Sequence, residues 1–406
     1  MQQLSPTQYG SPSAEGERLE LIDALRGFAL AGVLLVNLSS FTLYAFLDDA
    51  ARAALPTAGF DRVADAIESL LVEEKAITLF SMLFGLGFAL QLERAQTRGS
   101  AGSRLYLRRI GVLLLFGVIH SYLFWWGDIL LIYALMGLLL VLCRKLSSRA
   151  LLLLGLSVAL VLPALIEPWM EALLEGMPAQ DTVERANLAA FSSPHWTTAL
   201  AQNMVFSNWA YVVWWDVWPF VFGRFLLGYW AGRAGLLQRP EVHRETLNRL
   251  FIATTIVGAA ATGFGYFEES LETNISAFAG QPGLALLRII LRAGPLALGV
   301  AYAAGFALLF LHASCRRYLR ALAPVGRMAL TNYLLQTAVC LSVFYGAGLG
   351  VGPRYGLVGI LSAWIVLFGA QIFFSRWWLS RYRFGPMEWL WRSLTYARRQ
   401  PLKLIA

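Results

Sequence analysis

The sequence predicts an all-α protein, a polytopic membrane helix bundle of about ten transmembrane helices with both termini in the cytoplasm. Three observations support this fold class. Apolar residues make up 58% of the 406 residues and charged residues only 14%, whereas a soluble domain carries roughly 25% charged residues. Apolar runs recur along the whole chain, and a spanning helix needs ~20 mostly apolar residues. The basic residues lie in alternate connections between these runs, as the positive-inside rule requires.

Ten apolar segments are the predicted spans. The second, fourth and fifth are short, and the eighth is long enough to tilt or to break near Gly294-Pro295. The first keeps Asp23 and Arg26 at its start and is predicted to be a retained signal anchor. In order, the spans are Ile22–Phe46, Ile77–Leu92, Ile110–Trp126, Ile129–Cys143, Leu151–Ile166, Val212–Ala231, Leu250–Phe267, Leu284–Leu311, Met328–Tyr345 and Leu357–Trp378.

The distribution of charge predicts the orientation. The side shared by the two termini carries 24 of the 33 basic residues, the opposite side carries five, and four lie inside helices. The opposite side is rich in Asp and Glu. We therefore expect residues 1–20 to be a polar, disordered tail, 21–380 the bundle with outer loops 47–75 and 167–211, and 381–406 a basic cytoplasmic tail. Two stretches of the outer loops, around Phe60–Leu71 and Trp169–Met177, have amphipathic helical spacing and are predicted to lie on the membrane surface.

Composition also argues against several classes of partner. The net charge of +8 comes from residues scattered between apolar runs, so nucleic acid is not an expected partner. Neither the four histidines nor the three cysteines have the spacing of a metal site, so we expect no metal and no tightly bound cofactor. Membrane lipids are the expected surroundings, and the oligomeric state stays open.

Ionisable residues inside the predicted spans are candidates for function, because each one costs ~2.5–3.5 kcal/mol on insertion scales unless it has a partner or a wet cavity. Asp23 and Arg26 share a face of the first helix, and Asn37 follows on that face about three turns later. A structural ion pair with an interhelical amide bond explains this stripe equally well.

His120 lies in the outer half of the third span, just before a Trp-Trp-Gly-Asp turn in which Asp128 is placed to cap the next helix. A hydrogen-bonded core histidine is the commoner explanation for a lone His in a helix. Histidine is also the side chain most readily used as a base or nucleophile near neutral pH.

The remaining candidates lie on three other helices. Asp216 and Arg224 are on the sixth span, where Gly228 and Gly232 favour close helix packing. Arg288 and Arg292 are one turn apart on the eighth span, with Glu268, Glu269 and Glu272 as expected structural partners, and Asn332 and Gln336 are one turn apart on the ninth. If these groups converge, they line a cavity open to the outer face, with a rim or an aromatic belt made by Trp125, Trp126, Trp214, Trp215 and Trp218.

Several blocks of sequence resemble the YeiB-like bacterial membrane proteins, a domain family of unknown function. They are LIDALRGFALAGVLLVN (21–37), LFSMLFGLGF (79–88), GVIH (117–120), WGDIL (126–130), YALMG (133–137), GRMALTNYLLQT (326–337), FYGAGLG (344–350) and GPMEWLWRSLTY (385–396). The resemblance covers nearly the whole chain from Leu21 and implies a multi-pass protein of the bacterial cytoplasmic (inner) membrane.

That family is similar to the wider transmembrane acyltransferase group, which includes acyltransferase-3 proteins and the heparan-glucosaminide N-acetyltransferases. The resemblance implies transfer of an acyl group from cytosolic acyl-CoA, as a co-substrate, to an extracytoplasmic sugar or lipid. Acyltransferase-3 proteins place a histidine eleven residues after the arginine of the Leu-Arg-Gly opening, where this chain has Asn37. The mechanism therefore does not carry over directly, and His120 is the candidate replacement.

On this hypothesis His120 is the general base or a transient acyl carrier, oriented by Asp128 or Asp216. Arg224, Arg288 or Arg292 would stabilise the oxyanion or hold an anionic acceptor, while Arg26, Arg108 and Arg109 would meet the CoA phosphates. Asn37, Asn332 and Gln336 complete the candidate substrate-binding residues. Two alternatives stay open, a transporter or flippase that uses the same polar core without chemistry, and a non-catalytic scaffold whose polar residues pair with one another.

Overall fold

The computed structural model describes residues 13–96, 101–265 and 267–404, so residues 1–12 of the predicted N-terminal tail lie outside the described part. Within it the chain is helical and forms no β-strand. The helices are α1 (Ser13–Phe41), α2 (Asp49–Ala53), α3 (Ala58–Leu71), α4 (Lys75–Gln96), α5 (Ala101–Leu123), α6 (Leu130–Leu142), α7 (Ser148–Leu156), α8 (Leu162–Leu174), α9 (Gln180–Phe191), α10 (Trp196–Val213), α11 (Val217–Ala234), α12 (Arg244–Gly265), α13 (Glu268–Leu311), α14 (Ala313–Leu319), α15 (Ala323–Arg327), α16 (Ala329–Phe344), α17 (Leu357–Leu379) and α18 (Pro386–Tyr396).

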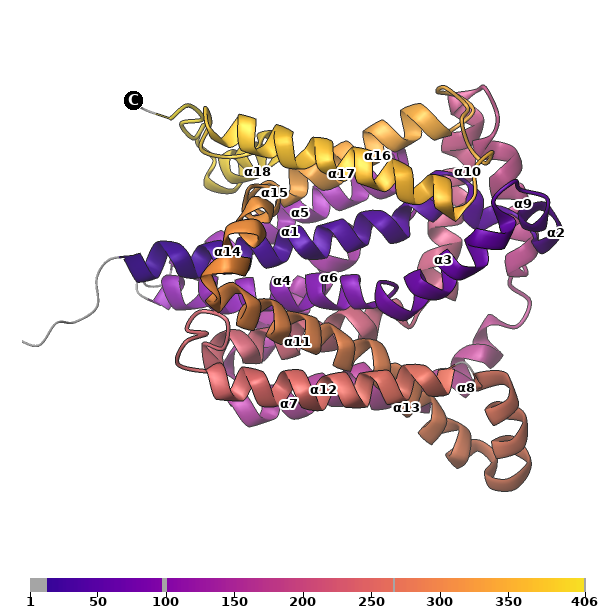
Figure 1. Ribbon diagram of the computed structural model, residues 1–406, viewed down its shortest axis with the longest axis horizontal. Coiled ribbons are helices and arrows are strands. Elements are labelled where there is room, and N and C mark those ends of the chain that lie inside the picture. The colour runs from indigo at the N-terminus through magenta and orange to yellow at the C-terminus, as the bar shows by residue number, and fades with distance from the viewer. Residues whose placement is uncertain (1–12, 97–100, 266, 405–406) are drawn as a thin grey trace, which may run out of the picture.

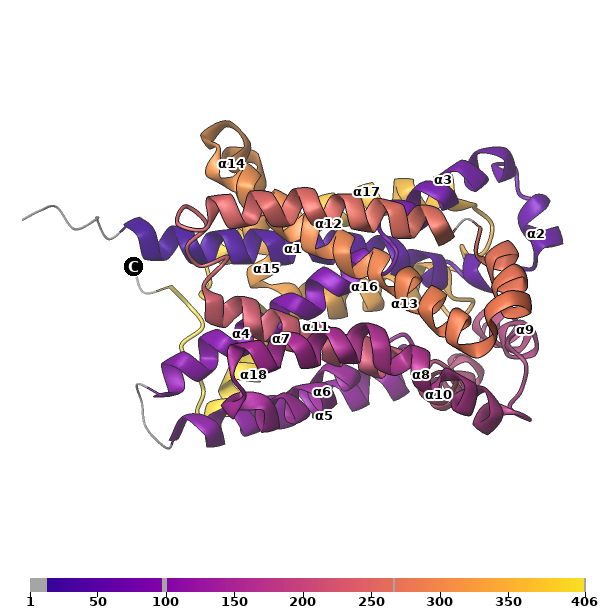
Figure 2. The same ribbon diagram turned by 90° about the horizontal axis from the view of Figure 1, so that it is seen from below.

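The long helices run roughly parallel to one axis and form a bundle with two distinct ends (Figures 1 and 2). The short helices α14, α15 and α18 lie at the end where α1 begins, which we call the basic end. Helices α2, α3, α8 and α9 gather at the opposite end, which we call the acidic end. The first helix thus begins at the end of the bundle where the last helix lies.

Each of the ten predicted spans coincides with a helix or a run of helices. Seven segments of the described residues are long and apolar enough to cross a membrane. They are Glu20–Phe41, Ala58–Leu92, Arg104–Leu123, Ser148–Leu174, Arg244–Gly265, Ala279–Leu311 and Leu357–Leu379. The other three predicted spans correspond to α6, α11 and α16, of 13, 18 and 16 residues. The protein is therefore an all-α bundle of the multi-pass membrane type, and the number ten and the orientation remain predictions.

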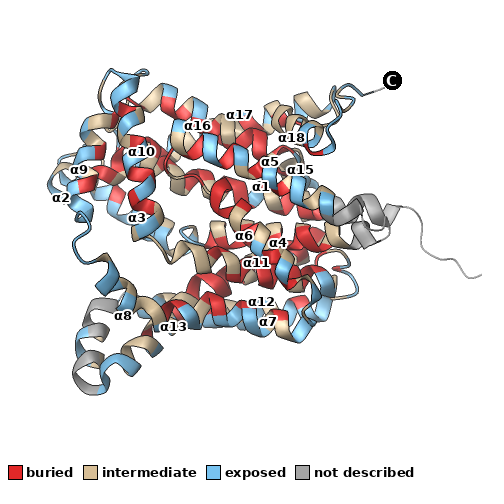
Figure 3. Ribbon diagram, turned by 180° about the vertical axis from the view of Figure 1, so that it is seen from behind, coloured by how far each residue is buried: buried red, intermediate tan, exposed pale blue. Residues whose placement is uncertain are grey.

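Burial follows the pattern of a protein in lipid. The central helices α1, α4 and α11 are largely buried, whereas α12 and α17 at the periphery are mostly exposed (Figure 3). Their exposed positions carry large apolar side chains such as Ile256, Ile365 and Phe373, with 64–76% of each residue accessible. A soluble protein would place polar residues there, so this surface fits contact with acyl chains.

Some helices were not anticipated from the sequence. Residues 196–211 of a predicted outer loop, with the first two residues of the sixth predicted span, form helix α10 at the acidic end. It packs on the end of α5, where the Asn203 Nδ2 donates to the carbonyls of Ser121 and Tyr122 at 2.8 and 3.1 Å. The helical structure predicted for the two amphipathic stretches is confirmed for Phe60–Leu71, within α3, and for 169–174, at the end of α8; their location on the membrane surface stays a prediction.

Helix α13 is interrupted at a different place from the one expected. Gly280 leaves the helical conformation with φ 58° and ψ −152°, while the chain stays helical through Gly294-Pro295. Glycine adopts positive φ without the steric penalty of a Cβ atom, so it is the natural site for the kink. The predicted break at Gly294-Pro295 is wrong.

The connection between α5 and α6 folds back into the bundle. Residues 124–129 form this turn, and α6 begins beside Gly117 rather than at the level where α5 ends. A Cβ atom on Gly117 would lie 2.4 Å from the backbone nitrogen of Leu131, so only glycine permits the approach. Asp128 is consequently carried into the interior, where its side chain is fully buried.

Helices α4 and α11 make a similarly close contact. A Cβ atom on Gly228 would lie 1.9 Å from the Met82 carbonyl oxygen, and one on Gly85 would lie 2.1 Å from that of Phe225. The prediction that Gly228 permits close helix packing is confirmed.

We expect Gly228→Ala to lower the free energy of unfolding by about 1–3 kcal/mol, because the added methyl group forces the two backbones apart. The measurement is the thermal midpoint of the detergent-solubilised protein. The matched control is Gly369→Ala on α17, where a Cβ atom would meet nothing within 4 Å. Equal midpoints for the two variants would contradict the prediction.

Candidate functional site

A cavity of about 580 Å³ lies inside the bundle, walled by residues of α1, α4, α5, α6, α16 and α18. Arg26 and Asn37 of α1 both line it, as the shared face of the first span predicts. Eleven residues of helix separate these two side chains, which corresponds to about 16 Å along the bundle axis. The cavity therefore runs from the basic end toward the acidic end.

Its composition changes along this length. Four arginines, Arg26, Arg109, Arg327 and Arg392, line the part near the basic end, which we call the arginine mouth. The middle is apolar. It is lined among others by Leu30, Val33, Phe80, Leu83 and Phe84. The far part is polar again and is lined by Asn37, Glu74 and Tyr333. Tyr133, whose ring contacts Phe80 and Phe84, lines the cavity at the level of the middle. This sequence of surfaces suits a ligand with an anionic head and an apolar or extended body.

The arginine mouth is held in place by neighbouring groups. Arg26 Nη1 donates to Asp23 Oδ1 at 2.8 Å, which confirms the predicted pairing. The Arg109 guanidinium lies 4.2 Å from the centre of the Trp391 ring, and Trp391 Nε1 donates to the Arg109 carbonyl oxygen at 2.8 Å. Arginine is suited to phosphate because its planar donors bind two oxygens at once.

Helix α18, from the predicted cytoplasmic tail, forms part of this wall. Glu388 accepts bonds from the backbone nitrogen and hydroxyl of Thr331 at the start of α16, at 3.0 and 2.5 Å. Burial raises the pKa of the Glu388 carboxyl above its ordinary value, and the two bonds from Thr331 oppose that shift. The C-terminal segment is thus anchored to the bundle core beside the arginine mouth.

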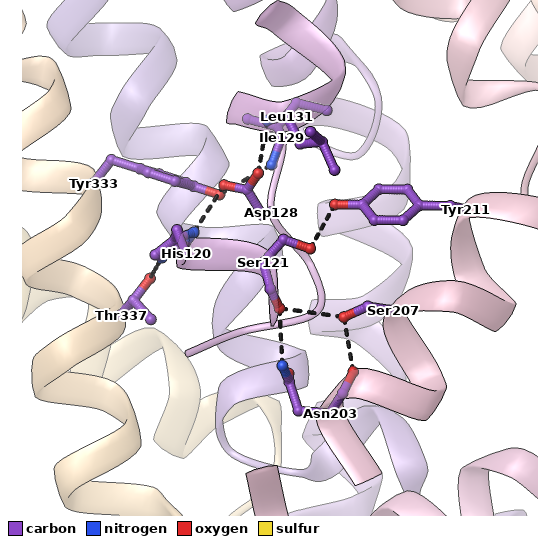
Figure 4. Close-up of polar contacts among 10 residues, drawn as sticks. All are labelled: His120, Ser121, Asp128, Ile129, Leu131, Asn203, Ser207, Tyr211, Tyr333 and Thr337. Atoms are coloured by element: carbon purple, nitrogen blue, oxygen red, sulfur yellow. Dashed lines mark hydrogen bonds and ion pairs between the residues drawn. The ribbon is translucent and has the colours of Figure 1, made fainter. Parts of the chain in front are cut away.

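Behind the far part of the cavity lies a chain of three polar side chains (Figure 4). His120 Nδ1 is 2.7 Å from Asp128 Oδ1, and His120 Nε2 is 3.0 Å from Thr337 Oγ1. The second carboxylate oxygen of Asp128 accepts from the Leu131 backbone nitrogen at 2.8 Å. The predicted capping role of Asp128 and its contact with His120 are therefore confirmed, and we call the three residues the His120 triad.

The His120 triad does not line the cavity but adjoins it. Only 5% of the His120 side chain is accessible. Tyr333 separates the two, since its side chain lines the cavity and its ring centre lies 5.3 Å from that of His120. The backbone nitrogen of Ile129 donates to the Tyr333 hydroxyl at 3.4 Å, which ties the turn that holds Asp128 to this same side chain (Figure 4).

Asp216, Arg288 and Arg292 form a different cluster. Arg292 contacts Asp216 at 3.2 Å and Glu167 at 3.4 Å, and Arg288 contacts Glu167 and Glu171 at 3.5 and 3.4 Å. Asp216 therefore pairs with Arg292 and not with His120. The side chains of Glu268, Glu269 and Glu272, the partners expected from the sequence, lie outside the described residues. This network joins α8, the start of α11 and α13 at the acidic end.

Arg224 is buried without a carboxylate in direct contact among the described residues. Its Nε donates to Thr78 Oγ1 at 2.6 Å, its Nη1 donates to the Phe220 carbonyl oxygen at 3.1 Å, and its guanidinium lies over the Phe220 ring. The strongest opposite charge acting on it is that of Glu74 at the far part of the cavity. Arg224 thus contributes positive charge behind Glu74 rather than a surface for a ligand.

Asn332, Gln336 and Arg108 lie away from the cavity. Asn332 Nδ2 donates to Ser375 Oγ at 3.0 Å, and Gln336 Nε2 donates to Gln371 Oε1 at 2.9 Å, so both residues join α16 to α17. Arg108 is exposed and donates to the Leu394 carbonyl oxygen at 3.3 Å. These three side chains therefore make contacts within the protein, and the predicted roles of Asn332 and Gln336 in substrate binding and of Arg108 in CoA binding are not supported. The predicted tryptophan rim is also wrong, since Trp125 and Trp126 are buried and pack against Phe41 and Phe206.

Five residues of this region were not singled out from the sequence: Glu74, Arg327, Tyr333, Thr337 and Arg392. The two arginines belong to the basic pattern that predicts topology, and Glu74 is one of several acids in the first predicted outer loop. Glu74 has a positive φ of 57°, which costs a residue other than glycine of order 1–3 kcal/mol and often marks a functional position. Thr337 is one turn after Tyr333, and both lie about 100° around α16 from the Asn332 and Gln336 amides, so helical spacing could have paired Tyr333 with Thr337.

Comparison with known proteins agrees with the sequence blocks. The family DUF418, described as a protein of unknown function, matches residues 231–398. The uncharacterized protein YxaH of Bacillus subtilis is 33% identical over 96% of this chain and 97% of its own length. The uncharacterized protein YeiB of Escherichia coli is 31% identical over 93% of this chain and 96% of its own length. No solved structure matches the chain. On this evidence the chain belongs to the YeiB-like, DUF418 family of bacterial proteins.

Proposed function

We propose that this protein is a transmembrane acyltransferase of the bacterial cytoplasmic membrane. It would take an acyl group from a CoA thioester at the basic end and pass it to a hydroxyl group of a sugar or lipid at the acidic end. The observation that carries this proposal is the single cavity that joins an arginine mouth, an apolar middle and a polar far part beside the His120 triad. A structural scaffold would have no use for such a cavity.

The arginine mouth is the proposed site of the CoA phosphates. Four guanidinium groups around one end of the cavity would provide charge-assisted, bidentate donors for a polyphosphate. The pantetheine arm and acyl chain would then follow the apolar middle toward Asn37. Of the three arginines assigned to CoA from the sequence, Arg26 and Arg109 keep this role, and Arg108 does not because it does not line the cavity.

The far part of the cavity is the proposed site of chemistry. In the overall reaction the C–S bond of the thioester breaks, a C–O bond to the acceptor forms, and the hydroxyl proton ends on the CoA sulfur. His120, oriented by Asp128, is the base that moves this proton. Rotation of the Tyr333 side chain would open the imidazole to the cavity. Asn37 and the Tyr333 hydroxyl line this part and would donate to the carbonyl oxygen, and Glu74 would accept bonds from acceptor hydroxyls.

The test uses purified full-length protein and acyl-CoA labelled in the acyl group. We expect saturable binding and acyl transfer to a hydroxyl acceptor, with His120→Gln at least about 10³-fold slower and still able to bind the donor. His195→Gln, on an exposed histidine at the acidic end, is the matched control. Absence of both binding and transfer, or a His120→Gln enzyme as fast as the wild type, would overturn the proposal.

One observation favours a second function, transport of an anionic amphiphile without chemistry. Both ring nitrogens of His120 are engaged and the imidazole does not line the cavity, whereas the arginine mouth and the apolar middle bind such a molecule equally well. Flux of a labelled anionic lipid across proteoliposomes without any acyl donor would support this alternative. Acyl transfer without such flux would remove it.

A further inference from the structure

We infer that Thr337 is the nucleophile of this site and carries the acyl group as an ester between two half-reactions. The inference rests on the proposed acyl transfer and adds the identity of the acyl carrier. It starts from the geometry of the His120 triad, in which a hydroxyl, an imidazole and a carboxylate are joined in series by contacts of 3.0 and 2.7 Å. This is the arrangement that activates serine and threonine nucleophiles on unrelated folds.

The hydrogen-bond partners determine which nitrogen of His120 carries the proton and which group donates in the bond to Thr337. Asp128 is an acceptor as a carboxylate, and one of its oxygens already accepts from the Leu131 nitrogen. The other oxygen therefore takes the Nδ1 proton of His120, which makes Nε2 the unprotonated nitrogen of the neutral ring. The Thr337 hydroxyl must then donate to Nε2. An oxygen that donates its proton to a base is prepared for attack on a carbonyl carbon.

The Thr337 hydroxyl differs from several other hydroxyls in the helices of this chain and behaves like those of Ser81, Ser121 and Thr331, which contact a side chain on another helix. A threonine or serine within a helix commonly donates to the carbonyl oxygen four residues before it. Thr254, Thr255, Ser342, Ser362 and Thr395 all do so, at 2.6–3.1 Å. In Thr337 the contact is made instead with His120, on a different helix. The side chain is thus held away from its own backbone and aligned with the base.

Access to Thr337 depends on one side chain. Thr337 is 1% exposed, and Tyr333, one turn earlier on α16, lines the cavity. Gly127, Ile129 and Leu130, which flank Asp128 in the chain, also line it. Tyr333 therefore lies between the cavity and the Thr337 side chain, and the proposal requires its ring to rotate before the thioester meets the Thr337 oxygen.

The two half-reactions balance as follows. The Thr337 oxygen attacks the thioester carbon, the new C–O bond forms as the C–S bond breaks, and the threonine proton passes through His120 Nε2 to the departing sulfur. The acceptor hydroxyl then attacks the threonyl ester and gives its proton to Nε2. His120 returns that proton to the Thr337 oxygen as the ester bond breaks.

The size of the cavity favours this order of events. A volume of about 580 Å³ is that of a site for one small ligand. A direct transfer needs donor and acceptor in the cavity together, whereas a carrier residue lets CoA leave through the basic end before the acceptor arrives from the other.

The experiment mixes full-length protein with acyl-labelled CoA in the absence of acceptor and quenches the reaction rapidly. We expect release of one CoA per protein and, by mass spectrometry, the label on the peptide that contains Thr337. Thr337→Ser should keep turnover within about tenfold and move the label to the serine. Thr337→Val should lose the CoA burst and about 10³-fold or more in turnover. Thr255→Val, on a half-buried helical threonine of α12 that bonds only to its own helix, is the matched control and should behave as the wild type.

Three outcomes would overturn the inference. Turnover with acceptor but no CoA burst without it, together with an active Thr337→Val enzyme, would remove the carrier and leave acyl transfer intact. A label found on His120 would assign the carrier role to the imidazole. Wild-type protein that neither releases CoA nor transfers the acyl group would remove both proposals. If the valine variant does not fold, the presence or absence of the label on the serine of Thr337→Ser still shows whether residue 337 carries the acyl group.

Discussion

An Asp128→Asn variant should lose acyl turnover by about 10³–10⁴-fold while keeping its affinity for the acyl donor. The amide can present only one acceptor oxygen, whereas the carboxylate serves both the Leu131 nitrogen and His120 Nδ1. The amide nitrogen would then face the imidazole and favour the tautomer with its proton on Nε2. In that tautomer Nε2 donates to Thr337 and cannot take its proton.

The measurement is the single-turnover rate with labelled acyl-CoA, alongside equilibrium binding of the same donor. Asp49→Asn, which removes an exposed carboxylate from α2 at the same end of the bundle, controls for the loss of charge. A turnover within tenfold of the wild type would show that the carboxylate serves only to cap α6.

Arg109→Gln should raise the Kd for acyl-CoA by about 10–100-fold, because a hydrogen bond to a charged group contributes roughly 1.5–3 kcal/mol. The chain provides an unusually close control. Arg108 is adjacent in sequence and carries the same charge, but it is exposed and bonded to the Leu394 carbonyl oxygen outside the cavity. Arg108→Gln should therefore change the Kd less than about threefold, within the value of a surface charge.

The two variants are compared by equilibrium binding at low and high salt. The loss in Arg109→Gln should persist at high salt because the guanidinium is enclosed by the cavity wall and the Trp391 ring. Equal effects of the two substitutions would show that the protein attracts CoA through its overall basic charge, without a defined phosphate site.

Much of the fold was predictable because each apolar run in lipid has to satisfy its own backbone hydrogen bonds, and a helix does so. A segment such as Leu357–Leu379 must be helical to satisfy its backbone in lipid, and its helix coincides with the predicted span. Helix α10 was missed because its apolar residues are mixed with Gln, Asn and Ser. Asn203 and Ser207 contact the end of α5, and Gln202 contacts Asn187 of α9, so these polar side chains face protein instead of lipid. The break at Gly280 was missed because the Pro in Gly294-Pro295 suggested the other place, although a proline can remain within a transmembrane helix.

The candidate site was predictable only in part. Asp23, Arg26 and Asn37 lie on one helix, so their shared face follows from helical periodicity. The contact between His120 and Asp128 spans only a short turn, so it was also predictable from the sequence. Convergence of residues from distant helices depends on which faces pack together, and spacing within one helix does not contain that information. For this reason the pairing of Arg288 and Arg292 with Glu167, Glu171 and Asp216 could not be predicted. The same holds for the contact between Thr337 and His120, which are 217 positions apart in the sequence.

The shortness of helix α6 would reduce the distance that the proposed acceptor has to cross within the bilayer. With 13 residues it is about 20 Å long, compared with the ~30 Å of a hydrocarbon core. The folded-back turn at residues 124–129 makes up the difference with backbone that is buried in protein. A sugar hydroxyl approaching Thr337 from outside would thus cross only the outer third of the bilayer, inside a sheath of protein. The acyl donor would enter the bilayer part of the way from one side and the acceptor part of the way from the other. Neither molecule would have to cross the whole membrane.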